Sequence, residues 1–343
     1  MKNIFYLFLF CLPLISNAQT NTNEKNTNYT LHHDVMWAEP KGHSLTMDIY
    51  TPNNDKTNYP VLIIYHGGGW LINDKSIMDE MSQYIASNSN YVVCNVDYRL
   101  LTANDNTTTM NEIIEDAMGA VLWVKEHITK YKGDPDNIAV TGDSAGGQLA
   151  AMVVNAGETL TAHSFEQEPI GFTPTYIPEG KTIDQLIANK ALEVQAAILS
   201  YPAVDIYASA LGGFEKESNF FWQMGGAKAR SIFGGEISAT SNLEFYKRCS
   251  PMYTIPASND RKLPPQFCHV GTEDKTTPPS SIKAYVDSLK VKGQNVEYWE
   301  YQGRNHAYLD SGSNEFLGNT FEKDAIMPIK KIIAFLDGVF YER

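Results

Sequence analysis

One serine stands among three glycines in the stretch VTGDSAGGQL, residues 140–149. An apolar run precedes it and a helix-forming run follows, which places Ser144 at a predicted strand-to-helix turn. Gly142 and Gly146 permit a close backbone approach there. This G-x-S-x-G pattern is typical of a nucleophile elbow, whose strained backbone pushes the serine hydroxyl outward. A purely structural turn fits the pattern equally well, so a catalytic serine also requires oxyanion donors upstream and an acid and a histidine downstream.

The expected oxyanion loop is HGGGW, residues 66–70, which directly follows an apolar run. Consecutive glycines let backbone N–H groups point into a site without intervening side chains, as a tetrahedral oxyanion requires. We predict Gly67 and Gly68 as donors, together with the N–H of Ala145. His66 is expected to brace the loop and not to act as the base. A phosphate-binding loop is the competing interpretation, but neither G-x-x-x-x-G-K-[ST] nor G-x-G-x-x-G occurs.

An acid and a histidine follow downstream in the required order. In GTEDKTTPP, Asp274 stands in a turn after the apolar run at residues 267–270. Glu273 is the adjacent alternative, but successive residues of an extended segment face opposite ways, and we favour Asp274. The stretch GRNHAYLD then places His306 in a loop after another strand-like run. These residues predict a Ser-His-Asp triad, in which the histidine takes the serine proton and the carboxylate orients the imidazole.

Alternating strand-like and helix-like runs are expected to position these residues. Apolar runs typical of buried strands lie at residues 61–65, 91–96, 138–140, 196–199 and 267–270, with a last strand at 296–301. Helical patterns lie at residues 79–86, 110–131, 144–154, 281–291 and 325–340. This alternation predicts an α/β fold with a mostly parallel central sheet, helices on both faces, and functional loops at the carboxyl ends of the strands.

The N-terminal composition differs from that of the rest of the chain. Lys2, an apolar stretch and Ser-Asn-Ala at residues 16–18 have the layout of a secretory signal peptide. We therefore expect residues 1–18 to be removed and the protein to be secreted or periplasmic. The polar residues 19–30 are expected to form a linker, and residues 31–343 one α/β catalytic domain.

The chain is acidic, with a formal net charge of −13. Loss of the signal peptide removes one of the 27 basic residues and none of the 40 acidic ones, which leaves −14. Such a charge argues against nucleic-acid or anionic-membrane partners, and no later segment reads as a membrane span. The remaining cysteines, Cys94, Cys249 and Cys268, are odd in number, so at most one disulfide is expected.

Taken in order, the motifs resemble those of the hormone-sensitive-lipase-like branch of the α/β-hydrolases. The resemblance runs from about residue 35 to the C-terminus and is carried by HGGGW, DYRL, GDSAGG, SP, GTEDKTTP and NHAY. It implies an α/β-hydrolase fold and a serine carboxylic-ester hydrolase with Ser144, Asp274 and His306 as its triad and no metal or organic cofactor. The strand-like N-terminal start replaces the helical cap of many members and resembles cap-less bacterial acetyl-xylan or feruloyl esterases.

Cover for the site is then expected from insertions at about residues 157–189 and 206–245, which are longer than a helix-to-strand connection needs. The predicted substrate-binding residues are two neighbours of the oxyanion loop and nucleophile and three aromatic residues of the second insertion: Trp70, Asp143, Phe220, Phe221 and Trp222. Aromatic clusters are also common in hydrophobic cores, so a structural role is the alternative for the three aromatic residues. Trp70 is expected to wall a short acyl pocket.

Secretion, acidity and the cap-less resemblance favour acetyl or feruloyl esters on polysaccharides as substrates. A general short-chain carboxylesterase is the main alternative. An aryl-formamidase is the next alternative, because HGGGW is similar to the loop of that related family. A catalytically inactive binding module is the alternative outside enzymes, and it is expected to lack a triad member. None is missing here.

Overall fold

The computed structural model describes residues 23–25 and 28–342, and its centre is one nine-stranded sheet. The strands are β1 (Asn23–Lys25), β2 (Tyr29–Ala38), β3 (Leu45–Pro52), β4 (Tyr59–Tyr65), β5 (Val92–Val96), β6 (Gly133–Asp143), β7 (Ala196–Ser200), β8 (Gln266–Gly271) and β9 (Val296–Tyr301). Their order is β1-β2-β3-β5-β4-β6-β7-β8-β9. Pairing is parallel from β5 to β9 and antiparallel from β1 to β5. The predicted mostly parallel sheet is confirmed.

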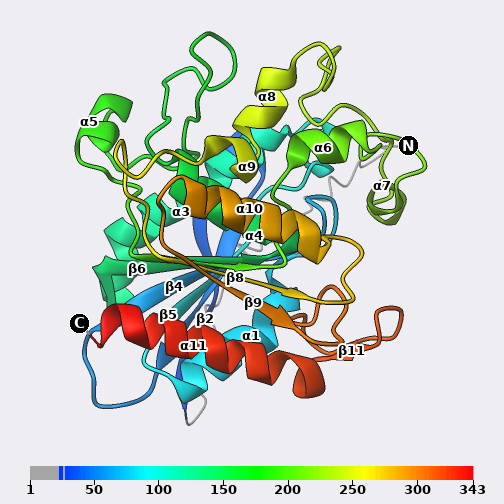
Figure 1. Ribbon diagram of the computed structural model, residues 1–343. Coiled ribbons are helices and arrows are strands. Elements are labelled where there is room, and N and C mark those ends of the chain that lie inside the picture. The colour runs from blue at the N-terminus through cyan, green and yellow to red at the C-terminus, as the bar shows by residue number, and fades with distance from the viewer. Residues whose placement is uncertain (1–22, 26–27, 343) are drawn as a thin grey trace, which may run out of the picture.

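Helices cover both faces of this sheet, as predicted. They are α1 (Asp79–Asn88), α2 (Ala103–Asn106), α3 (Met110–His127), α4 (Ser144–Ala156), α5 (Ile183–Ala188), α6 (Ile206–Leu211), α7 (Phe220–Met224), α8 (Leu243–Arg248), α9 (Pro251–Thr254), α10 (Pro279–Val291) and α11 (Ile326–Phe340). Figure 1 shows α3, α4 and α10 on one face and α1 and α11 on the other. Because β4, β5 and β7 lie between these layers, every residue in them is buried.

The N-terminal segment only partly matches its prediction. The predicted signal peptide, residues 1–18, lies outside the described residues. Within the predicted linker, β1 pairs antiparallel with β2, with Asn23 opposite His32 and Lys25 opposite Thr30. For residues 23–25 and 29–30, the linker assignment is therefore wrong. Backbone N–H and C=O groups pair without any apolar side chain, so composition does not reveal such an edge strand.

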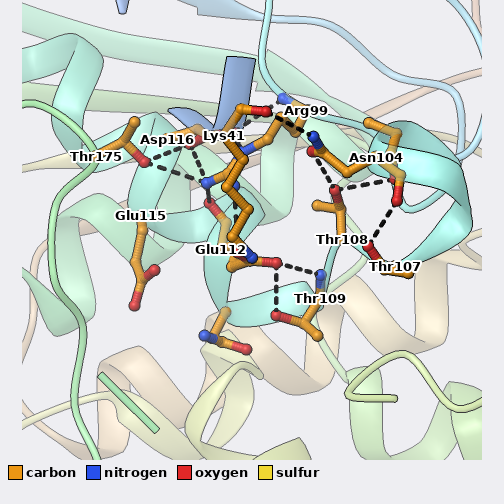
Figure 2. A network of polar contacts seen from close by, with 12 residues as sticks. Lys41, Arg99, Asn104, Thr107, Thr108, Thr109, Glu112, Glu115, Asp116 and Thr175 are labelled. Carbon is orange, nitrogen blue, oxygen red and sulfur yellow. Dashed lines mark hydrogen bonds and ion pairs between the residues drawn. The ribbon is translucent and has the colours of Figure 1, made fainter. Parts of the chain in front are cut away.

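The insertion at residues 157–189 packs against α3. Arg99, from the DYRL motif, donates from Nε and Nη2 to the two carboxylate oxygens of Asp116 on α3, at 2.8 and 2.7 Å. The hydroxyl of Thr175, in the insertion, donates to the same carboxylate. Figure 2 shows Arg99 and Thr175 meeting at Asp116, with Glu112 also bound to Arg99. The hydrogen bond from Thr175 to this buried ion pair therefore joins the first insertion to α3.

A second carboxylate of α3, Glu115, also binds the first insertion. The Ser164 hydroxyl and the Thr173 N–H both donate to its Oε1. Burial raises the pKa of Glu115 from 4.5 to about 7, although both of these hydrogen bonds act to lower it. Since the folded-state pKa exceeds the ordinary value, the stability contributed by the protonated group is fully present below pH 4.5 and is lost as pH rises through about 7.

Replacement of Glu115 by Gln is expected to make stability less dependent on pH. The glutamine oxygen can accept from Ser164 and Thr173, while the buried charge is removed. As the pH rises from about 5 to about 8, the free energy of unfolding of the variant should increase relative to that of the wild type by up to about 3 kcal/mol. Thermal unfolding at the two pH values measures this gain, with the exposed Glu244→Gln as the control. An equal difference between Glu115→Gln and wild type at both pH values would contradict a charge penalty.

Candidate active site

Ser144 lies at the carboxyl end of β6 and begins α4, as the motif predicts. Its φ of 50° is in the left-handed region, which is strained for a serine. A methyl group on Gly142 would overlap the carbonyl of Gly146, and one on Gly146 would overlap the carbonyl of Tyr65. Both glycines are thus required by close backbone contacts, and the turn holds the serine at the edge of the sheet.

The three predicted triad residues lie in one hydrogen-bonded chain. His306 Nε2 is 2.9 Å from Ser144 Oγ, and His306 Nδ1 is 2.7 Å from Asp274 Oδ2. All three side chains are buried, whereas Glu273 is exposed. Because Nδ1 faces a carboxylate, it carries the ring hydrogen and leaves Nε2 free to accept from the serine hydroxyl. This arrangement can activate the hydroxyl as a nucleophile.

Three further residues position the acid and the base. Thr277 donates its N–H to Asp274 Oδ1 at 2.9 Å, and its hydroxyl lies 3.1 Å from Oδ2. The Tyr201 ring meets the His306 ring edge-on, with centroids 4.8 Å apart. Asn319 donates from its side-chain amide to the His306 carbonyl. Thr277 lies within GTEDKTTP and was therefore open to prediction, but no motif marks Tyr201 or Asn319.

The predicted oxyanion donor Gly67 has another partner. Its N–H binds the Asp143 carboxyl, which also binds the Tyr201 side chain. The assignment of Gly67 to the oxyanion hole is therefore wrong. Burial raises the pKa of Asp143 to about 6, against the lowering effects of His306 and of these hydrogen bonds. Asp143 does not line the cavity beside the nucleophile, so its predicted contact with substrate is also wrong.

The neighbouring glycine, Gly69, takes a place that the sequence did not predict. Gly69 and Ala145 line the same cavity as Ser144, whereas Gly68 does not. The φ values of Gly68 and Gly69, 122° and 58°, turn the loop sharply at this point. Ala145 thus borders the cavity, and the donor roles of Ala145 and Gly68 stay predictions.

A cavity of about 420 Å³ opens beside the nucleophile. Its outer wall comes from the second insertion, including α6 and the segment that leads into α7: Ala208, Ser209, Gly212, Phe214, Asn219 and Phe221. Among the described residues, those of the first insertion do not line it. Of the two insertions expected to cover the site, the one at residues 206–245 therefore does so.

Trp70 lines this cavity as predicted. Its indole Nε1 donates to Gln148 Oε1 at 3.1 Å, and its ring meets Phe214 edge-on with centroids 5.5 Å apart. The side chain is only 3% exposed, so packing on several sides fixes its position. Trp70 is consequently a rigid part of the wall beside the oxyanion loop.

The three successive aromatic residues of α7 have different surroundings. Phe221 lines the cavity, and its ring lies so close to Gly69 that a Cβ there would be 2.8 Å from it. Trp222 is 1% exposed and donates from Nε1 to the Phe214 carbonyl, so it is a core residue and its predicted contact with substrate is wrong. Phe220 is 56% exposed and lies outside the cavity.

The three cysteines expected to remain in the mature chain are buried free thiols: Cys94, Cys249 and Cys268. Burial raises the pKa of each thiol. Buried thiols of this kind are inert. The one disulfide that the sequence allowed is therefore not formed. In the part of the chain that the structure describes, no helix has the length and apolarity needed to cross a membrane.

Comparisons with known proteins agree with this geometry. The BD-FAE family model matches residues 47–289. Carboxylesterase NlhH of Mycobacterium tuberculosis strain H37Rv is 36% identical over 263 residues, which cover 76% of this chain and 70% of that protein. Probable isoprenylcysteine alpha-carbonyl methylesterase ICMEL1 of Arabidopsis thaliana is 25% identical over 77% of this chain, but the match spans only about half, 48%, of that protein.

A solved structure shares the fold. Thermogutta terrifontis esterase 2 phosphorylated by paraoxon aligns with a TM-score of 0.64 at 21% identity, over 92% of this chain and 95% of that one. At this identity the match supports the α/β-hydrolase architecture.

Proposed function

The chain belongs to the BD-FAE family of hormone-sensitive-lipase-like α/β-hydrolase esterases, and from this premise we propose that it is a serine carboxylesterase that removes acetyl or feruloyl groups from polysaccharides. The observation that supports the esterase activity is the chain of hydrogen bonds from Ser144 through His306 to Asp274, in which Ser144 lines the cavity. The acidic composition supports the polysaccharide part, as does the strand-like segment at β2, which resembles the start of acetyl-xylan or feruloyl esterases.

The mechanism follows from the positions of these groups. Ser144 Oγ attacks the ester carbonyl while His306 Nε2 takes its proton, and Asp274 stabilises the imidazolium that forms. The oxyanion is held by the N–H of Ala145 and by the loop glycines beyond Gly67. The alcohol then leaves with the proton from His306, and water repeats these steps on the acyl-enzyme. The chemistry requires no group beyond these residues.

We propose in addition that the enzyme is exported. The basic residue, apolar stretch and small-x-small site at residues 2–18 support cleavage near Ala18. Export would bring the enzyme to polysaccharides outside the cytoplasm. N-terminal sequencing of the protein recovered from its native cells tests this, because an N-terminus at residue 1 would contradict cleavage.

A general short-chain carboxylesterase is the second candidate, and the similarity to a carboxylesterase at 36% identity favours it. A panel of acetylated xylan, methyl ferulate, p-nitrophenyl esters and N-formylkynurenine separates the candidates. Release of acetate or ferulate at a kcat/KM above that for p-nitrophenyl acetate supports the polysaccharide proposal. Activity on p-nitrophenyl esters alone supports the second candidate, and activity on N-formylkynurenine alone an aryl-formamidase.

If the acyl group is acetyl and not feruloyl, acyl chains of about two to four carbons should be preferred. Each methylene that a pocket accepts is worth only about 1–3 kcal/mol, so a steep fall beyond that length needs a steric wall. Trp70 supplies this wall in the structure. The Trp70→Ala variant is expected to flatten the fall of kcat/KM along a series of p-nitrophenyl esters, whereas Trp70→Phe should keep most of it.

Trp299→Ala is the control for this series, since Trp299 lies on β9 and does not line the cavity. Its profile should match that of the wild type. A wild-type preference for acyl chains of about eight carbons or more would overturn the short pocket, because such a chain requires a longer apolar trough.

A further inference from the structure

Two exposed phenylalanine rings meet on the surface next to the active site. Phe220 on α7 is 56% exposed, and Phe316 is 88% exposed in the turn of a hairpin between β10 (Ser313–Asn314) and β11 (Asn319–Thr320). Their centroids are 6.4 Å apart and their planes differ by 18°. Among the described residues these are the only phenylalanines that are largely exposed. Two nearly parallel, water-exposed rings form an apolar surface of the kind that marks a binding site.

Both rings are tied to the catalytic site through their own segments. Phe220 precedes Phe221, which lines the cavity against Gly69. On the other side, Asn319 of the hairpin donates to the carbonyl of His306. Figure 1 shows α7 and the hairpin of β11 on the same side of the molecule. The ring pair therefore belongs to two segments that both contact the active site, and neither ring lines the cavity itself.

We propose that Phe220 and Phe316 form an aromatic platform that stacks on a sugar ring of the polysaccharide next to the sugar that carries the ester. A pyranose presents a face of C–H groups, which carry a slight positive charge and match the negative face of an aromatic ring. Stacking also removes apolar area from water. This proposal rests on the proposed function and adds a subsite for the part of the substrate that remains after deacylation.

The charges near the platform favour a glycan over a lipid surface. Exposed Glu217 and Glu315 lie close in sequence to the two rings, with exposed Lys216 beside Glu217, and the whole chain has a net charge of −13. Carboxylates repel an anionic membrane, which is bound through basic residues. They accept hydrogen bonds from neutral hydroxyl groups, which a sugar supplies in number. The surface therefore suits a neutral polyhydroxylated chain.

The test compares a polymeric with a small substrate in Phe220→Ala, Phe316→Ala and the double variant. The ratio of kcat/KM on acetylated xylan to kcat/KM on p-nitrophenyl acetate should fall about tenfold in the double variant, mainly through KM, because two aromatic contacts with the polymer are lost. Phe316→Trp should leave this ratio near the wild-type value, because the substitution keeps a flat aromatic ring at this position. Tyr341→Ala, an exposed aromatic residue at the C-terminal end of the chain, is the matched control and should leave the ratio unchanged.

Direct binding separates the platform from the proposed function. Ser144→Ala, which should not hydrolyse the ester, is titrated with xylohexaose by calorimetry, with and without the two phenylalanine substitutions. Binding that is lost in the triple variant supports the platform, even if acetylated xylan proves to be no substrate and the proposed function fails. An unchanged ratio in the double variant, or no xylohexaose binding by Ser144→Ala, overturns the platform. A parallel loss on methyl ferulate and xylan also overturns it, because it places the rings in the acyl pocket.

Discussion

Ser144→Ala is expected to lower kcat by about a millionfold while the protein stays folded. The substitution removes the nucleophile, and the remaining groups can only bind and polarise the ester. Since Ser144 Oγ has His306 Nε2 as its partner, the loss of one hydroxyl leaves the rest of the site in place. Initial rates on p-nitrophenyl acetate measure the effect, and circular dichroism checks the fold.

The chain contains a matched control in a second serine–histidine pair. Ser200 Oγ lies 2.9 Å from His269 Nε2, the same separation as in the triad, but both residues are fully buried and do not line the cavity. Ser200→Ala is expected to retain wild-type activity, with stability lowered by about 1–3 kcal/mol for the unpaired partner. If Ser144→Ala kept more than a few per cent of the activity, Ser144 would not be the nucleophile.

Asp274→Asn should lower kcat by about four orders of magnitude, the cost of the wrong histidine tautomer. Asp274 Oδ1 accepts the N–H groups of Thr276 and Thr277, both at 2.9 Å. An asparagine would keep its oxygen there and turn its amide NH₂ group toward His306 Nδ1. That ring nitrogen would then have to accept, which places the ring hydrogen on Nε2. Nε2 would be unable to take the serine proton.

The neighbouring Glu273 provides the control for this prediction. Glu273→Gln is expected to leave kcat within about twofold of wild type, since exposed substitutions away from special features have small effects. Both variants are assayed on p-nitrophenyl acetate at neutral pH. A large loss in Glu273→Gln with full activity in Asp274→Asn would reassign the acid of the triad.

The fold class and the triad were predictable because their signals are local or periodic. Apolar runs show which strands are buried on both faces, and β4, β5 and β7 are buried throughout. The elbow needs glycine at fixed distances from Ser144, because any side chain there would overlap backbone. The order of strands then brings the loops after β6, β8 and β9 to one edge of the sheet. Signals of this kind can be recognised in a single sequence.

Contacts between distant segments were not predictable in this way. No pattern shows that Asn319 reaches the carbonyl of His306 or that Gly67 donates to Asp143. The sequence does not show in which direction a backbone N–H points. A glycine run therefore predicts backbone donors but not which of them already has a partner. The pairing of β1 with β2 was hidden for the same reason.

The aromatic residues of α7 show where the sequence alone ends. Phe220, Phe221 and Trp222 are chemically alike and adjacent, so composition gives them one role. Successive helical residues point about 100° apart, which sends Trp222 into the core, Phe221 into the cavity and Phe220 into solvent. The sequence by itself determined that this insertion carries an aromatic surface. Only the packing of α7 against the oxyanion loop and the core decided which ring lines the cavity, because burial depends on what lies opposite each side chain.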